Sequence, residues 1–129
     1  MRAWRAAAAV LALLAAASLL AAGRPSLNAY FQTTLKDDAY QKKAFDRVAK
    51  AWKSPPAKSF PRLGAKAVVQ AVIARDGKLN AASVSTASGS VEWDGAALAA
   101  VKKAAPFDRL PSGYGFPAVE VHFHFEVVK

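Results

Sequence analysis

The chain of 129 residues contains no cysteine, and this absence removes several classes of chemistry at once. Disulfide bonds, thiolate metal sites and cysteine nucleophiles are all excluded. The common catalytic and phosphate-binding signatures are missing as well: there is no G-x-S-x-G, no H-E-x-x-H and no glycine-rich phosphate loop. Only two histidines occur in the whole chain. Little in the sequence therefore points to a catalytic site, and we predict no cofactor.

Acidic residues are also scarce, because nine aspartates and glutamates stand against 18 lysines and arginines, which gives a net charge of +9. Residues 1–23 hold two of the arginines and no acidic residue, so the remainder carries +7. A basic surface favours anionic partners such as lipid headgroups, envelope polymers, acidic proteins or nucleic acid. Charge alone does not choose among them. The length is enough for one domain with a single modest core.

Only one long apolar run is present, and it lies at the start of the chain. Met1–Gly23 carries two arginines, then apolar residues from Ala6 to Ala22, and it ends in Ala-Ala-Gly, an acceptable cleavage site. As a helix this run would span about 25 Å, short of the ~30 Å hydrocarbon core of a bilayer. We predict a cleaved export signal, with a short retained inner-membrane anchor as the alternative. The domain then lies in the periplasm, which argues against nucleic acid as a partner.

After this segment, we predict that residues 24–34 form a linker and that residues 35–129 form one domain. Tyr40, Ala44, Val48 and Trp52 are spaced four apart, which predicts an amphipathic helix with one apolar stripe. Two prolines follow at once, and they end the helix because proline lacks the N–H group and restricts the residue before it.

The stretch Lys66–Val101 predicts a hairpin followed by a second helix. Apolar and polar residues alternate on both sides of Asp76-Gly77, and that pair is typical of a two-residue type I′ turn, in which both central residues have positive φ. Ser88-Gly89-Ser90 then ends the second strand. Asp94 is predicted to cap the helix by accepting backbone N–H bonds.

The last segment, Ala118–Val128, shows the cleanest alternation in the chain. Its odd-numbered positions are apolar and form the core side of a strand, whereas the other side carries Glu120, His122, His124 and Glu126. We place this strand antiparallel beside the first strand of the hairpin. The prediction is an α+β fold: a three-stranded antiparallel sheet of order 2-1-3, with two helices packed on one face and the last strand at an edge.

The stripe of two histidines and two glutamates is the only cluster that could suggest a metal. His122 and His124 lie ~7 Å apart along a strand, a spacing that suits Zn²⁺ if a third ligand comes from elsewhere. The plainer interpretation is the solvated face of a half-buried strand. We therefore predict no metal site, with His122 and His124 as the alternative.

The order of these motifs resembles a known family. The motifs are Asp76-Gly77-Lys78-Leu79, Ser88-Gly89-Ser90, Asp94, Ala96-Ala97, Ala100-Val101, Leu110-Pro111 and a β-rich C-terminus. In this order they resemble the C-terminal domain shared by the TonB and TolA cell-envelope proteins, over about residues 35 to 127. The upstream helix, with Pro55 after it, resembles the TolA type more than the TonB type.

The resemblance implies a non-enzymatic periplasmic module that binds envelope or outer-membrane proteins. In that family the open edge of the last strand takes on a strand from the partner, and an open edge is a template for such β-augmentation. Carried over to this chain, the partner-binding edge comprises Ala118, Val119, Glu120, Val121, His122, Phe123, His124, Phe125, Glu126 and Val127.

The chain departs from the full energy transducers of this family in two ways. Arg24–Ala29 reaches at most ~20 Å, far less than their long spacer. The apolar run has no ionisable residue, which coupling to a proton-driven motor would need. We therefore expect an exported, stand-alone domain that binds a partner strand or modulates a TonB- or TolA-like system. A homodimer through the same edge and a basic envelope-binding or metal-binding protein are the alternatives.

Overall fold

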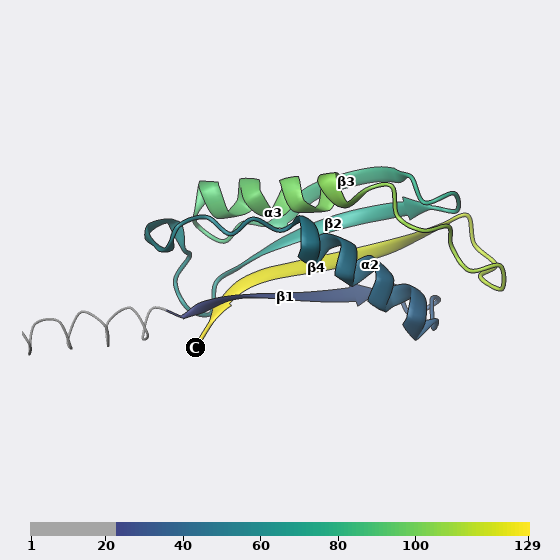
Figure 1. Cartoon of the computed structure of the whole chain (residues 1–129), viewed down its shortest axis with the longest axis horizontal. Helices are drawn as coiled ribbons and strands as arrows, with labels where there is room; N and C mark the ends of the chain where they lie inside the picture. Colours follow the sequence, from purple (N-terminus) through teal and green to yellow (C-terminus); the bar gives the residue numbers. More distant parts are fainter. Residues whose placement is uncertain (1–22) are drawn as a thin grey trace, which may run out of the picture.

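The computed structural model describes residues 23–129, in which two helices pack on one face of an antiparallel sheet (Figure 1). In chain order the elements are β1 (Arg24–Phe31), α2 (Asp38–Ala51), a 3₁₀ turn (Ala57–Ser59), β2 (Lys66–Ala74), β3 (Leu79–Thr86), α3 (Val91–Ala104) and β4 (Ala118–Val128). Apart from Gly23, the predicted export signal or anchor lies outside the described residues. No helix within residues 23–129 combines the length and the apolar character that crossing a bilayer requires.

The sheet corrects the prediction of three strands, because it has four, in the order β1-β4-β2-β3. The three predicted strands keep their expected neighbours, with β2 between β3 and β4. The fourth, β1, comes from residues that we expected to form a linker. It alternates Leu27, Ala29 and Phe31 with polar residues, but Arg24-Pro25 at its start and its distance in sequence from β4 concealed the pairing.

The core lies between the helices and the odd-numbered side chains of β2 and β4. In Figure 1, α3 runs over β2 and β3, whereas α2 lies nearer β1. The largest side chains that are fully buried are Trp93, Phe123, Phe125, Ile73, Val48 and Val69. Trp93 is the centre of an aromatic group: its ring meets Trp52 edge-on at 5.0 Å and Phe60 at 5.4 Å between centroids. Its Nε1–H also donates to the Phe125 carbonyl at 2.9 Å, so this buried polar atom is satisfied.

Helix α2 forms where the spacing of apolar residues predicted it, with Tyr40, Ala44 and Val48 buried. Asp37 caps its start by accepting the Tyr40 N–H at 2.9 Å. Trp52, the fourth residue of the predicted stripe, is the C-cap and is only half-buried. The helix therefore ends where the following prolines require it to end.

The hairpin turn differs from the predicted two-residue type I′ turn. The Ala74 carbonyl accepts the Gly77 N–H at 2.9 Å, and the Ala74 N–H donates to the Lys78 carbonyl at 2.8 Å, so the loop contains three residues. Within this loop only Gly77 has positive φ, at 91°, and no non-glycine residue among those described has positive φ. This is a type I turn followed by a left-handed glycine, the common three-residue hairpin loop.

The second helix also starts earlier than predicted. Ser90, not Asp94, is the N-cap, and its hydroxyl accepts the Trp93 N–H at 3.3 Å. Asp94 lies inside the first turn, and its carboxylate reaches back to accept the Ser88 N–H at 3.0 Å. Both side chains accept backbone N–H bonds at the start of the helix. Ser90 is the cap because serine is as good an N-cap as aspartate and stands four residues before Asp94.

We predict that Gly77→Ala lowers the free energy of unfolding by at least about 2 kcal/mol. A Cβ at this position would lie 2.0 Å from the Phe107 carbonyl oxygen, and the positive φ disfavours any side chain. Urea unfolding followed by circular dichroism measures the change. The matched control is Gly95→Ala in the interior of α3, where nothing lies within 4 Å of the new Cβ. This control should gain up to about 1 kcal/mol, and equal effects at the two sites would contradict the interpretation.

Candidate functional site

β4, which we predicted to lie at an open edge of the sheet, has a neighbouring strand on each side. β4 pairs with β2 through nine residues and, on its other side, with β1 through eight. β4 is therefore an interior strand of the described sheet, and the prediction that the last strand lies at an edge is wrong. The physical reason is β1, which occupies the outer side of β4 from Val121 to Val128.

The hydrogen bonds show which backbone groups of β4 point toward β1. The Gln32 N–H donates to the Glu120 carbonyl at 2.9 Å, which makes this a hydrogen-bonded pair. In an antiparallel ladder such pairs recur at every second residue. On the other side, the Arg75 N–H donates to the Pro117 carbonyl at 2.9 Å, so odd-numbered residues of β4 bond to β2. The groups that face β1 belong to Glu120, His122, His124, Glu126 and Val128.

β1 is held mainly by its backbone pairing with β4. None of its eight side chains is fully buried, and Arg24, Asn28 and Tyr30 are exposed. Leu27, Ala29 and Phe31 lie on the helix side, where they are partly buried against the core. By contrast, the residues of β4 opposite them, Phe125, Phe123 and Val121, are at most 1 % exposed. β1 therefore adds partly buried side chains at the margin of a core whose fully buried residues lie on β4, β2 and the helices.

The sheet face away from the helices carries the predicted polar stripe. His122 Nε2 lies 3.0 Å from a Glu120 carboxylate oxygen, and the other oxygen accepts the Gln70 side-chain N–H at 2.9 Å. His124 has a different partner, because its ring packs against Tyr30 of β1 in a tilted arrangement, with the centroids 4.6 Å apart and 59° between the ring planes. Burial lowers the pKa of His124, and the nearby charges of Lys66 and His122 act in the same direction.

The two histidines thus point to different neighbours. Within residues 23–129, no three His, Asp or Glu side chains lie close enough together to hold a metal ion.

Burial, with a smaller contribution from Asp108, raises the pKa of Tyr40 to about 12, and its hydroxyl donates to the Asp108 carbonyl at 2.8 Å. That phenol is a structural hydrogen-bond donor of α2.

The two outer edges of the described sheet are less suited to pairing. The outward N–H groups of β1 belong to its odd-numbered residues, and one of these is Pro25, which has no N–H. In β3 the register shifts twice against β2, which leaves Asn80 and Ser85 as extra residues. Such bulges interrupt a ladder and protect an edge from further pairing.

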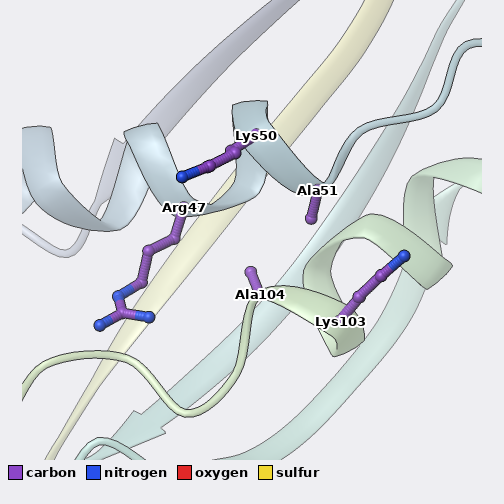
Figure 2. A pocket seen from close by; sticks show the side chains of 5 residues that line it. All are labelled: Arg47, Lys50, Ala51, Lys103 and Ala104. Atoms are coloured by element: carbon purple, nitrogen blue, oxygen red, sulfur yellow. The ribbon is translucent and has the colours of Figure 1, made fainter.

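A second surface feature is a basic hollow between α2 and α3 (Figure 2). Its sides carry Arg47, Lys50 and Lys103, and Ala51 and Ala104 contribute only methyl groups. Arg47 is paired with Asp108 at 2.8 Å. Lys50 and Lys103 lie in the last turns of their helices, where a cation interacts favourably with the helix dipole.

The residues that the sequence analysis missed are those of β1 that lie on β4. Tyr30 and Phe31 were visible as aromatic residues near the first helix, and the alternation over residues 26–31 was the available signal. A strand of this kind needs a partner about 100 residues away, which no local pattern reveals.

Comparison with known families gives one result. Residues 37–125 match the family model described as TonB C terminal. This range starts at the cap of α2 and ends within β4, so it leaves β1 out. No curated protein and no solved structure gives a significant match. The match does not address closeness to the TolA type, which stays a prediction.

We predict that the domain loses stability as the pH falls below about 6.5 and that His124 contributes to this loss. A histidine whose pKa is lowered in the folded state binds fewer protons there than in the unfolded chain, so acid favours unfolding. Urea unfolding at pH 7.5 and 5.5 should show a smaller loss for His124→Gln than for the wild type. An equal loss in the two proteins would contradict this role for His124.

Proposed function

This chain belongs to the TonB C-terminal family, and we propose that it is a periplasmic module that binds an extended strand of an envelope or outer-membrane protein along β4. Domains of this family are non-enzymatic interaction modules in envelope transport. The observation that supports this site most directly is the pairing of β1 with β4, because it demonstrates a strand docked on that edge. In this proposal the partner strand takes the place of β1.

The backbone of β4 supports such an exchange. The groups that bond β1 come from alternate residues, Glu120 to Val128, and every one would be free to bond another strand once β1 leaves. Backbone hydrogen bonds of this kind give affinity, and the side chains of alternate residues give selectivity. The β2 side of β4 stays paired throughout, so the core remains intact.

The cost of releasing β1 is small compared with global unfolding. Each backbone hydrogen bond contributes a net ~1 kcal/mol, and ordering a residue costs about 1–2 kcal/mol, so these two contributions nearly cancel. What remains is the partial burial of Leu27, Ala29 and Phe31, about 1–3 kcal/mol. A partner that must displace β1 would then bind roughly 5- to 150-fold more weakly than one meeting a free edge.

Export to the periplasm and closeness to the TolA type belong to the same proposal. The basic, alanine-rich start of the chain supports export, either as a cleaved signal or as an inner-membrane anchor. A second copy of the chain is also a candidate partner, because its β1 has the sequence that pairs with β4.

A second candidate function is binding to an anionic envelope surface through the basic hollow. The supporting observation is that Lys50 and Lys103 lie beside the same hollow and come from different helices (Figure 2). Neither lysine has a carboxylate partner among the described ion pairs. Phosphate headgroups would supply the negative charge that these lysines lack as a partner.

We predict that a disulfide between β1 and β4 blocks partner binding. Ser26 lies opposite Glu126 at a hydrogen-bonded pair, where the Cα atoms are ~5.5 Å apart, within the range for a disulfide. Since the chain has no cysteine, Ser26→Cys with Glu126→Cys forms one defined bond. Immobilised oxidised protein should capture less from an envelope extract than the same protein reduced and alkylated, and mass spectrometry identifies the proteins that differ.

The matched control is Val72→Cys with Ala81→Cys, which joins β2 to β3 and leaves β1 free. Oxidation of this pair should not change the capture. If oxidation of the Ser26/Glu126 pair leaves capture unchanged as well, partners use another edge and the proposed β4 site is wrong.

For the second candidate we predict that Lys50→Glu with Lys103→Glu weakens binding to anionic vesicles roughly tenfold or more at low salt. Lys58→Glu with Lys78→Glu is the control, because it changes the net charge equally at other places on the surface. Equal losses in a vesicle co-sedimentation assay would show that net charge, and not the hollow, determines binding.

A further inference from the structure

The way β1 lies on β4 shows which side chains that edge accepts on its helix side. Leu27 is opposite Phe125, Ala29 is opposite Phe123 and Phe31 is opposite Val121. All three side chains of β1 are partly buried against the core. A charged group in any of these places would lose water without gaining a partner, which is unfavourable. The small residue lies at the centre, between two larger ones.

On the other face, one aromatic residue of β1 makes a specific contact. Tyr30 is opposite His122 in the register, yet its ring packs at a tilt against the diagonal neighbour His124, with the centroids 4.6 Å apart. Diagonal pairs on a sheet are within reach of aromatic side chains. Tyr30 is 56 % exposed, so this contact, and not burial in the core, defines its position.

His124 is well suited to such a contact. Directly opposite it lie Asn28 of β1 and Val68 of β2. The titratable groups around it are His122 and Glu126 on β4, Tyr30 on β1 and Lys66 on β2. The lowered pKa of His124 keeps the imidazole neutral at pH 7, and a neutral ring packs on another ring without a cost in hydration. At acid pH the protonated ring carries a positive charge, which is unfavourable beside Lys66 and His122.

We infer that the β4 edge is selective: it accepts an extended segment with apolar residues opposite Phe125 and Val121, a small residue opposite Phe123, and an aromatic residue that packs against His124. This inference rests on the proposed exchange of β1 for a partner strand. It describes the chemistry of the partner segment, which has the pattern apolar, any, small, aromatic, apolar, as in Leu27–Phe31.

The end of the pairing adds a polar feature to this pattern. The residue after β1, Gln32, uses its side-chain oxygen to accept the Glu120 N–H at 3.2 Å, while its own N–H donates to the Glu120 carbonyl. One residue thus satisfies both backbone groups of Glu120. A partner segment with an amide or carboxylate at this place would do the same.

The test uses the full chain with Ala29→Asp, which weakens the docking of β1 and leaves β4 unchanged. The probe is a fluorescent peptide with the sequence of Arg24–Phe31, RPSLNAYF, and binding is measured by anisotropy. Circular dichroism reports whether the variant is folded. If it is not, the wild-type chain with excess peptide gives the same comparison, because the peptide then competes with its own β1.

We predict that the peptide with Tyr30→Ser binds roughly 2- to 10-fold more weakly, because it lacks the ring contact. The peptide with Leu27→Asp should bind at least about tenfold more weakly. The loss caused by Tyr30→Ser should disappear when the chain also carries His124→Ser. It should persist with His122→Ser, the matched control, because His122 faces Tyr30 in the register but does not stack on it.

Two results would contradict these proposals, and they differ. If all the peptides bind equally, or if the loss from Tyr30→Ser is the same with and without His124→Ser, the selectivity is wrong and the β4 site stands. If no peptide binds the weakened chain, the β4 site itself is wrong.

Discussion

The fold depends on β4, whose backbone is bonded on both sides and whose alternate side chains form the centre of the core. Phe123 and Phe125 point under the helices and are at most 1 % exposed, while the residues between them face away. A one-residue slip would turn all of these apolar side chains to the opposite face. The register against β2 is therefore strongly fixed. The aromatic contacts of Trp93 with Trp52 and Phe60, together with its hydrogen bond to the Phe125 carbonyl, hold both helices to the same strand.

The same alternation divides the backbone bonds of β4 between its two neighbours. Odd-numbered residues of β4 bond β2, and their side chains lie in the core, against which Leu27, Ala29 and Phe31 of β1 also pack. Even-numbered residues bond β1 and carry the polar stripe of the open face. A partner strand on the β1 side would therefore meet His122 and His124 without disturbing the core. In the proposed exchange, the bonds between β4 and β2 would therefore stay in place while β1 is replaced.

The family of this chain could be recognised from its sequence, whereas the strand that pairs with the outer side of β4 could not. The matched range, residues 37–125, covers both helices and the three strands that the sequence predicted. β1 lies before this range and changes an open edge into a filled one. A partner strand that pairs with β4, as the family implies, would have to displace β1. This displacement costs free energy that addition to a free edge would not.

Local patterns were enough for much of the fold. The four-residue spacing of Tyr40, Ala44 and Val48 predicted α2, and the alternation in Ala118–Val128 predicted both the strand and its buried side. These predictions hold because burial imposes one period on a helix and another on a strand. Caps and turns were less certain: Ser90 and Asp94 both accept backbone N–H bonds at the start of α3, and only the geometry showed that Ser90 is the cap.

The sequence by itself determined that the chain forms helices and strands around one apolar core, that it has no cysteine chemistry and that its charge is strongly basic. Only the tertiary structure decided that β1 fills the outer side of β4 and that Tyr30 lies on His124. The physical reason is that the periodicity of apolar residues that predicts a helix or a strand involves only a few neighbouring residues. Which strand occupies an edge depends instead on hydrogen bonds between segments about 100 residues apart, and backbone groups are the same in every residue except proline.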